Sequence, residues 1–310
     1  MVSYADFHKM PRRRKAAMEL GIHASLGIPK HIRIYLDNGA FYFLTHGGDV
    51  SRSAYEEFVK NAHPDWYPIP QDYIPIPHMS PEQQRACLMR TMQVNLEYQH
   101  DGYVPVIHIS PLLSEYTQAI KVHDQLSVKP AIALGGIVPN LLRAPKSMSH
   151  QDILNSLQGI RQEFAGKALH VFGIGGTATL HVAALLRIDS VDSSGWRNRA
   201  ARGLIQLLGT GDRSVANLGK WRGRELSPSE RELLSQCQCP ACKHNGMNGL
   251  ELGGTQGFQN RATHNLWTLL TEASWVEKRL ADGNYREEYQ THMDNTIYRP
   301  LIDRLVQQNF

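Results

Sequence analysis

Two aspartates, each at the end of an apolar run, are the first candidates for chemistry in this sequence. Asp192 ends the run 188–192 within LHVFGIGGTATLHVAALLRIDSVDSSGWRNRAARG (residues 169–203), which predicts a strand, a Gly-rich turn, a helix and a second strand. Asp37 ends the run IRIYLD and precedes Asn-Gly, a pair typical of tight turns. In parallel α/β architectures the working residues lie where strands end and loops begin. An aspartate that only caps a helix is the alternative for Asp192.

Three arginines follow Asp192 at a spacing that suits a helix: Arg197, Arg199 and Arg202. Such spacing places at least two of them on one side of a helical turn, which suits contact with a phosphate backbone. A solvated basic helix is the alternative interpretation.

Three of the four cysteines lie close together, in the pattern Cys237-x-Cys239-x-x-Cys242. This spacing is typical of a metal site rather than a disulfide framework, and it fits a reducing compartment. The surrounding polar segment, residues 219–261, contains too few apolar residues to fold on a core of its own, so we expect a structural zinc to organise it. The fourth ligand is predicted to be His264, which opens a long helix, or His244. Buried cysteines without a metal are the alternative.

Length and composition limit the class of protein. The 310 residues carry a net charge of +4, which is compatible with an acidic or nucleic-acid partner without requiring one. No apolar run approaches the roughly 20 residues of a membrane span. The N-terminal MVSYADFHKMPRRRK lacks the apolar core of a secretory signal. The sequence therefore predicts a soluble, cytoplasmic protein.

An alternation of strands and helices must position these residues. Apolar runs predict strands within 1–10 and at 32–37, 73–77, 103–109, 129–138, 169–175 and 188–192, with the Pro-rich residues 63–71 as a connector. Helices are predicted at 11–27, 53–60, 80–98, 111–125, 151–164, 177–187 and 263–280. The apolar face of the last helix is expected to hold Leu266, Leu269, Leu270, Ala273, Val276 and Leu280.

This alternation predicts an α/β fold with a parallel sheet covered on both faces. We expect a TIM-type (β/α)8 barrel with a shortened N-terminal part, whose remaining strand lies within 204–208 or in an irregular first element. A barrel would bring Asp37, Asp192 and the Gly135–Gly136 pair to one mouth, whereas a doubly wound open sheet is the alternative. The predicted domains are the barrel with its catalytic face (1–218), a zinc-binding subdomain (219–265) and C-terminal helices packing on the barrel (266–310).

Five motifs in this order resemble the tRNA-guanine transglycosylase superfamily, zinc-containing barrel enzymes that exchange a guanine in nucleic acid for a 7-deazaguanine. DNGAF (37–41) resembles the family's Asp-Ser-Gly-Gly-Phe/Tyr, GGIV (135–138) its Gly-Gly-Leu/Ile loop, and LHVFGIGG (169–176) its Leu-Met-Gly-Val-Gly. Residues 189–203 resemble the strand with its nucleophilic aspartate, and the cysteine triplet with His264 and Asn265 resembles its zinc site. The resemblance covers roughly residues 30–280 and is strongest to the DpdA-type DNA-guanine transglycosylases, which are often phage-encoded.

The resemblance implies a role for each matched residue. Asp192 would be the nucleophile that attacks C1′ of the target nucleotide, and Asp37 the general acid/base that assists the departing or incoming base, as in retaining glycosidases. Base binding is implied for Asn38, Gly39, Phe41, Gly135, Gly136, Phe172 and Gly173, with ordinary core packing as the alternative for the two phenylalanines. The nucleic-acid backbone would be bound by Arg197, Arg199 and Arg202, and structural Zn²⁺ by Cys237, Cys239, Cys242 and His264.

The base pocket departs from the family pattern at two places. YIPIPHMS offers Pro77 and His78, and no acid, where the family places a purine-recognising aspartate after the next strand. His108 stands where the tRNA enzymes carry a glutamine. A target base must leave its stack to reach such a pocket, so we expect a flipped or single-stranded substrate.

The sequence therefore predicts a glycosyltransferase that replaces guanine in DNA with a preQ0-type 7-deazaguanine through a covalent aspartyl-glycosyl intermediate. DNA is favoured because the pocket departs from the bacterial tRNA enzymes and no RNA-binding C-terminal domain like that of archaeal relatives is recognised. A tRNA-guanine transglycosylase of the queuosine or archaeosine pathway is the first alternative. A non-catalytic nucleic-acid-binding subunit, against which both aspartates argue, and a zinc-stabilised protein with a small-molecule role are the others. The family suggests a homodimer or an accessory protein, and no membrane partner is expected.

Overall fold

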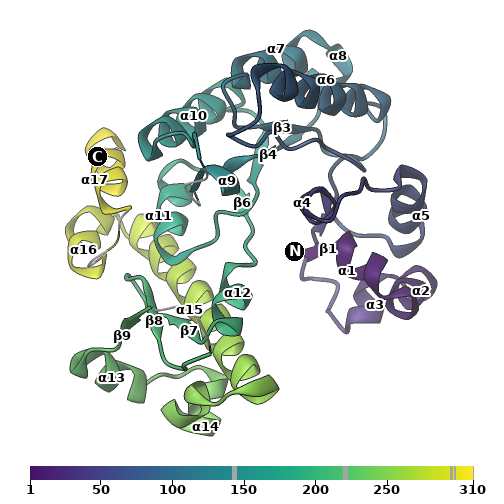
Figure 1. Cartoon of the computed structure of the whole chain (residues 1–310). Helices are drawn as coiled ribbons and strands as arrows, with labels where there is room; N and C mark the ends of the chain where they lie inside the picture. Colours follow the sequence, from purple (N-terminus) through teal and green to yellow (C-terminus); the bar gives the residue numbers. More distant parts are fainter. Residues whose placement is uncertain (142–144, 219–222, 294–295, 297, 310) are drawn as a thin grey trace. The chain divides into compact units, whose positions relative to one another are not determined.

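The computed structural model describes residues 1–141, 145–218, 223–293, 296 and 298–309 (Figure 1). The chain divides into two compact units, unit 1 (Met1–Phe172) and unit 2 (Gly173–Phe310). The predicted boundary after residue 218 adjoins residues 219–222, which lie outside the described residues, and the predicted three-part division stays a prediction. Within the described ranges, no helix combines the length and the apolar character needed to cross a membrane.

Unit 1 alternates strands with helices, as predicted. Its described strands are β1 (Val2–Ser3), β2 (Leu36–Asp37), β3 (Val106–His108), β4 (Ala131–Gly135) and β5 (Ala168–Val171). Its described helices are α1 (Tyr4–Lys9), α2 (Pro11–Leu20), α3 (Ile22–Leu26), α4 (Ala40–Thr45), α5 (Arg52–Ala62), α6 (Pro81–Glu97), α7 (Leu113–Val122), α8 (Asp124–Ser127), α9 (Ile137–Leu141) and α10 (His150–Glu163).

The strands of unit 1 pair in parallel and in chain order. β1 pairs with β2, β3 with β4, and β4 with β5. Residues 66–69 lie between β2 and β3, because Leu36 N donates to Trp66 O (2.8 Å) and Ile69 N donates to Val104 O (3.0 Å). The order shows no reversal of the kind found at the switch point of a doubly wound sheet. The α/β class with parallel sheets is confirmed, whereas the closed barrel stays a prediction.

The predicted strand at residues 73–77 is wrong. These residues are all described and form no strand, because Pro75 and Pro77 have no N–H to donate to a neighbouring strand. Residues 66–69 take that place, although Pro68 and the prolines on either side of the segment suggest a connector. The predicted order of segments in unit 1 is therefore preserved. The segment that lies between β2 and β3 ends at residue 69 instead of residue 77.

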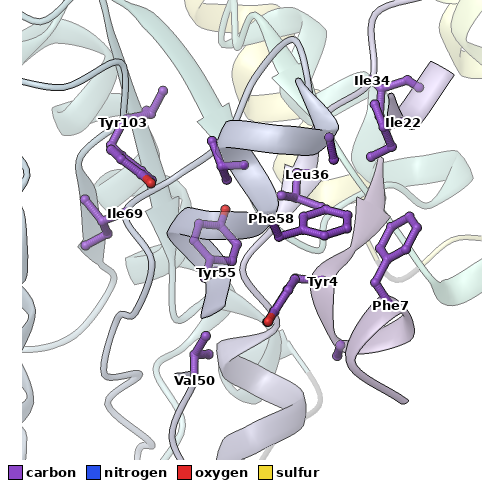
Figure 2. Packing of buried hydrophobic residues seen from close by; sticks show 14 of the residues in the cluster. Tyr4, Phe7, Ile22, Ile34, Leu36, Val50, Tyr55, Phe58, Ile69 and Tyr103 are labelled. Carbon is purple, nitrogen blue, oxygen red and sulfur yellow. The ribbon is translucent and has the colours of Figure 1, made fainter. Parts of the chain in front are cut away.

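Aromatic side chains fill the core that supports β1 and β2 (Figure 2). The ring centroids of Tyr4 in α1 and Tyr55 in α5 are 5.2 Å apart, and those of Phe7 and Phe58 are 4.7 Å apart. Leu36 of β2 lies fully buried in the same cluster. Aromatic pairs of this kind contribute about 0.5–1.5 kcal/mol each beyond the area they bury. This packing supports β1 and β2, and therefore the position of Asp37 at the end of β2.

Unit 2 contains short strands and a long central helix. Its described strands are β6 (Ser190–Val191), β7 (Leu204–Gln206), β8 (Asp212–Ser214) and β9 (Arg224–Glu225). Its described helices are α11 (Thr177–Leu185), α12 (Gly195–Ala201), α13 (Pro228–Ser235), α14 (Pro240–Glu251), α15 (Gly254–Ala281), α16 (Tyr285–His292) and α17 (Arg299–Asn309). A strand is present within 204–208 as β7. It pairs antiparallel with β8, which pairs in parallel with β9, so its predicted place as a barrel strand stays a prediction.

Helix α15 begins about two turns before the predicted start at residue 263, at Gly254. It contacts α11, α12, α14 and β7. Two leucines predicted for its buried face are instead exposed, Leu266 by 39% and Leu270 by 60%. Much of the buried face is polar, as Arg261 shows: its Nε donates to Ala200 O (2.8 Å) and its Nη1 to Leu250 O (2.7 Å). Hydrogen bonds therefore organise this unit together with apolar contacts.

The segment that carries the cysteines shares a small apolar core with a strand outside it. Leu226, Leu234 of α13 and Leu250 of α14 pack with Ile205 of β7. The core uses a strand outside the segment, which is why the segment's own composition did not predict it. Glu230 near the start of α13 links the segment to β8. Arg213 of β8 donates to Glu230 Oε1 through Nε (2.9 Å) and Nη2 (2.5 Å).

We predict that the Arg213–Glu230 pair makes part of the stability sensitive to acid. The hydrogen bonds from Arg213 lower the pKa of Glu230 from 4.5 to about 2. Because the folded pKa lies below the unfolded one, the contribution is complete above pH 4.5 and is lost as the pH falls toward 2. In denaturant titrations, Glu230→Gln should lower the free energy of unfolding by roughly 1–3 kcal/mol at neutral pH, and by progressively less in acid.

Glu232→Gln, on the exposed side of the same helix, is the matched control and should have little effect at any pH. If Glu230→Gln lowers the free energy of unfolding by the same amount at neutral pH and in acid, the prediction is contradicted.

Candidate functional site

Polar and small residues gather at the carboxyl ends of the parallel strands in unit 1. Asp37 ends β2, Asp72 follows the segment 66–69, His108 ends β3 and Gly135 ends β4. Parallel strands present their carboxyl ends at the same edge of a sheet, so these residues share one edge. The structure therefore places Asp37 and the Gly135–Gly136 pair at the same ends of parallel strands, with the segment 66–69 and β3 between them, and their meeting at one barrel mouth stays a prediction.

Asp37 is held by the strand next to it. Its Oδ2 accepts hydrogen bonds from Ser3 Oγ (2.8 Å) and Gly39 N (3.1 Å), and Ser3 lies opposite Asp37 in the β1–β2 register. Gly39 has a φ of +81°, and a Cβ there would lie 3.0 Å from the Cβ of Ala5. Glycine is therefore required at this turn, and the N-terminal strand fixes the orientation of the carboxylate.

Asn38 binds protein groups on both sides of its amide. Its Nδ2 donates to Asp72 Oδ1 (2.7 Å) and to Ile69 O (2.9 Å), while its Oδ1 accepts from Ala40 N (2.9 Å). The side chain is 2% exposed. The role that this geometry shows is to position Asp72, and the predicted contact of Asn38 with a purine edge stays a prediction.

Asp72 is a candidate functional residue that sequence reasoning missed. It is 7% exposed and lies just beyond a segment that pairs as a strand. With that strand placed at 73–77, the sequence shows no acid after it, but the true segment at 66–69 places Asp72 there. The signal that could have identified it is the apolar run WYPI before the acid.

His108 lies fully buried beside Asp72. Its Nε2 is 3.0 Å from Asp72 Oδ2, but this contact does not have the geometry of a hydrogen bond. Neither ring nitrogen has a hydrogen-bond partner among the described residues. Buried polar groups almost always have partners, so an unsatisfied imidazole beside a carboxylate is typical of a group that binds a polar ligand. A Cβ at Gly135 would lie 2.8 Å from His108 Nδ1, which explains the glycine.

The other predicted base-binding residues of unit 1 lie near these strand ends. Gly136 has a φ of +75°, and a Cβ there would lie 2.9 Å from Ile109 O. Phe172 follows β5 and packs edge-on against His170, with ring centroids 4.7 Å apart. Phe41 of α4 is 48% exposed. The stacking of Phe41 and Phe172 on a purine stays a prediction.

Asp192 follows β6 in unit 2 and is bound by the glycine-rich turn. Gly173 N donates to Asp192 Oδ1 (2.8 Å), and Gly175 N donates to the backbone oxygen of Asp192 (3.0 Å). Gly173 has a φ of +80°. A Cβ at Gly175 would lie 2.7 Å from the Cβ of Ser193, so the turn can approach the aspartate only as glycine. The predicted place of Asp192 at a strand end is confirmed.

The three predicted phosphate-binding arginines lie on or just after α12. Arg197 and Arg202 are exposed. Arg199 is partly engaged, because its Nε donates to Asp212 Oδ1 (2.6 Å). Their contact with a nucleic-acid backbone stays a prediction, and Arg197 and Arg202 have the greater exposure for it.

Cys237, Cys239, Cys242 and His264 lie together and could bind a metal ion such as zinc. The Nδ1 of His264 lies 3.6 Å from the Sγ of Cys237, 3.6 Å from that of Cys239 and 3.5 Å from that of Cys242. A tetrahedral zinc with bonds of ~2.3 Å to sulfur and ~2.0–2.1 Å to nitrogen requires S···N separations of about 3.5 Å. The group therefore has the dimensions of such a site. The alternative ligand, His244, is exposed and lies outside the group.

Hydrogen bonds around the metal group orient its ligands. His264 Nε2 contacts Gln206 O (3.0 Å), and this bond keeps Nδ1 directed to the cysteines. The next residue, Asn265, accepts from Gln206 N through its Oδ1 (2.7 Å), so α15 holds β7 at both backbone atoms of Gln206. Hydrogen bonds from Cys239 and Cys242 lower the pKa of Cys237, which favours the thiolate that binds metals.

A comparison with models of known protein families finds no match to the chain, and a search of curated proteins finds none either.

Loss of one cysteine should remove the metal. Cys239 is fully buried and caps α14, where Cys242 N donates to its Sγ (3.2 Å). Cys239→Ser should lower the metal content by about one ion per chain and the free energy of unfolding by several kcal/mol, because structural metal binding contributes to folding. Metal content is measured by mass spectrometry of the digested protein, and stability by denaturant titration.

Cys87→Ser is the control, since Cys87 lies in unit 1 and outside the metal group. If Cys239→Ser keeps the full metal content of the unchanged protein, the Cys–His group is not a metal site.

Proposed function

We propose that this chain is a base-exchange transglycosylase that replaces guanine in DNA with a 7-deazaguanine. The observation that carries the proposal is the group formed by Asn38, Asp72 and His108 beside Asp37, at the carboxyl ends of parallel strands. A buried carboxylate that is held in place, next to an imidazole without hydrogen bonds, is suited to binding a polar heterocycle. The family resemblance supplies the identity of that heterocycle.

Asp72 is suited to recognise guanine. Guanine presents hydrogen-bond donors on its Watson–Crick edge, including the N2 amino group, and an ionised carboxylate is an acceptor with about four lone-pair sites. Asn38 takes one of these sites, so Asp72 can still accept from a base. His108 lies alongside and can donate to or accept from the ring. Asp72 thus fills the role of the purine-recognising aspartate that the sequence had not revealed.

The proposed reaction proceeds through a covalent intermediate. A carboxylate oxygen of Asp192 attacks C1′ of the target nucleotide, the bond from C1′ to guanine breaks, and an ester to Asp192 forms. Asp37 donates a proton to the departing guanine and takes one from the incoming 7-deazaguanine, which attacks C1′ and releases Asp192. The hydrogen bonds from Ser3 to Asp37 and from Gly173 to Asp192 orient each carboxylate before reaction.

The remaining groups serve binding and folding in this proposal. The target base leaves its stack to be read, Phe41 and Phe172 offer aromatic faces for it, and Arg197, Arg199 and Arg202 contact phosphates. The Cys–His group binds zinc with four protein ligands, which gives it a structural role. The in-order parallel strands of unit 1 favour a (β/α)8 barrel as the complete fold. DNA is favoured over tRNA because His108 replaces the glutamine of the tRNA enzymes.

Guanine exchange tests the proposal. The protein is incubated with radiolabelled guanine and, in separate reactions, duplex DNA, single-stranded DNA or bulk tRNA, and the label retained in polymer is counted. We expect label in DNA and none in tRNA. Label in tRNA alone would assign the chain to the tRNA enzymes instead, and label in neither polymer would contradict a self-sufficient transglycosylase.

Asp72→Asn separates base recognition from catalysis in the same assay. It keeps an oxygen for Asn38 but removes the charge that a guanine donor would meet, so kcat/KM for guanine should fall roughly 10- to 100-fold, mainly through KM. The control is Asp49→Asn, an exposed aspartate paired with Arg90, which should leave exchange unchanged. Equal exchange by Asp72→Asn and the unchanged protein would remove Asp72 from the site.

A further inference from the structure

A second group of side chains that could hold a metal ion lies in unit 2 and shares no residue with the Cys–His group. It is formed by His181 of α11, Glu272 of α15 and His292 of α16, whose ligand atoms lie within 4.8 Å of one another. His181 and Glu272 are fully buried, and the His292 side chain is 15% exposed. Neither the family resemblance nor the proposed reaction accounts for this group.

The carboxylate of Glu272 is the centre of the group. Its Oε1 lies 2.8 Å from His181 Nε2 and 2.5 Å from His292 Nε2, while its Oε2 accepts from Gly209 N (2.7 Å). A tetrahedral ion at ~2.0–2.1 Å from two nitrogens and one oxygen needs these atoms about 3.3 Å apart. Rotations that move each imidazole outward by less than about 1 Å would provide that spacing, since both rings already direct Nε2 at the same oxygen.

The surroundings of the group hold its ligands in place. His181 Nδ1 lies 2.6 Å from the hydroxyl oxygen of Tyr285, an arrangement like the outer partners that orient metal-binding histidines. The ring of His292 stacks on Trp275, with centroids 3.8 Å apart and planes 8° from parallel. Gly209 has a φ of +62°, and a Cβ there would lie 1.8 Å from His292 O, so only glycine lets this loop reach Glu272.

We propose that His181, Glu272 and His292 form a second metal site, which binds a divalent transition-metal ion such as zinc. Two imidazoles and one carboxylate are a ligand set that zinc and other first-row metals accept, with a fourth position left for water or another ligand. In the metal-bound form both Nε2 atoms coordinate the ion through their lone pairs. The Nδ1 of His181 then carries the proton and donates it in a hydrogen bond to the Tyr285 hydroxyl. The ion would join α11, α15 and α16. This inference is independent of the proposed reaction.

Metal stoichiometry tests the second site. The full chain is stripped with a chelator, reloaded with Zn²⁺ and desalted, and zinc per chain is measured by mass spectrometry against protein concentration. We expect two ions per chain in the unchanged protein and one in His292→Phe, which keeps an aromatic ring on Trp275 but removes a ligand. His100→Phe, at an exposed histidine of unit 1, should keep two ions. Cys239→Ser should also keep one ion, which His181, Glu272 and His292 would bind without a thiolate ligand.

Cobalt(II) titration of the unchanged protein makes the test independent of any variant's folding. Cobalt at the Cys–His site gives thiolate-to-cobalt charge-transfer absorption. A second equivalent of cobalt, bound by nitrogen and oxygen, should add weaker visible bands and leave the charge-transfer absorption unchanged. Saturation at one equivalent of cobalt, together with one zinc per chain that His292→Phe does not change, would overturn the proposal. The group would then be a hydrogen-bonded network around Glu272 with no metal.

Discussion

Parallel strand pairing in unit 1 places the carboxyl ends of β2, β3 and β4 and of the segment 66–69 at one edge, and each candidate group at that edge is held by a different strand. The arrangement depends on register, because a shift of one residue would turn every side chain to the opposite face. Hydrogen bonds then connect the strand ends: Ser3 binds Asp37, and Asn38 binds Asp72. Neither ring nitrogen of His108 has a hydrogen-bond partner among the described residues.

In unit 2 the corresponding constraint is the polar face of α15. His264 and Asn265 bind the backbone of Gln206, and Glu272, two turns further along the same helix, binds Gly209. The end of β7 and the loop that follows it are therefore each bound to the helix. Buried polar groups rigidify a fold when they are satisfied and destabilise it when they are not. A metal ion at the Cys–His group would bind His264 of this face, and a second ion at His181, Glu272 and His292 would bind Glu272 of the same face.

Local signals in the sequence were sufficient to predict much of this structure. Apolar runs bounded by glycine and proline identify β2, β4 and α11, and the spacing of three cysteines identifies the metal group. The errors arose where tertiary contacts override local pattern. Trp66–Ile69 pairs as a strand in spite of Pro68, so Asp72 was overlooked. Gly254 and Gly257 lower helix propensity, so the local pattern predicts too late a start for α15. Leu270 is exposed although its spacing predicts core, because the helix buries Asn265 and Glu272 instead.

The His181–Glu272–His292 group could not be predicted from the sequence, because its members are far apart along the chain and have no characteristic spacing. Only the packing of three helices brings them together. The same holds for Asn38 and Asp72, whose hydrogen bond depends on the pairing of β2 with residues 66–69. Chemistry carried by one loop, such as the three cysteines, is visible in a sequence, whereas chemistry assembled across elements is not.

We propose that Asp192 is the nucleophile, and the position of the covalent intermediate on the chain tests this proposal. The protein is incubated with guanine-containing DNA, denatured and digested, and the peptides are examined by mass spectrometry for an attached deoxyribose. We expect an adduct on Asp192, its loss in Asp192→Asn and its persistence in Asp189→Asn. An adduct on another residue, or continued guanine exchange by Asp192→Asn, would contradict it.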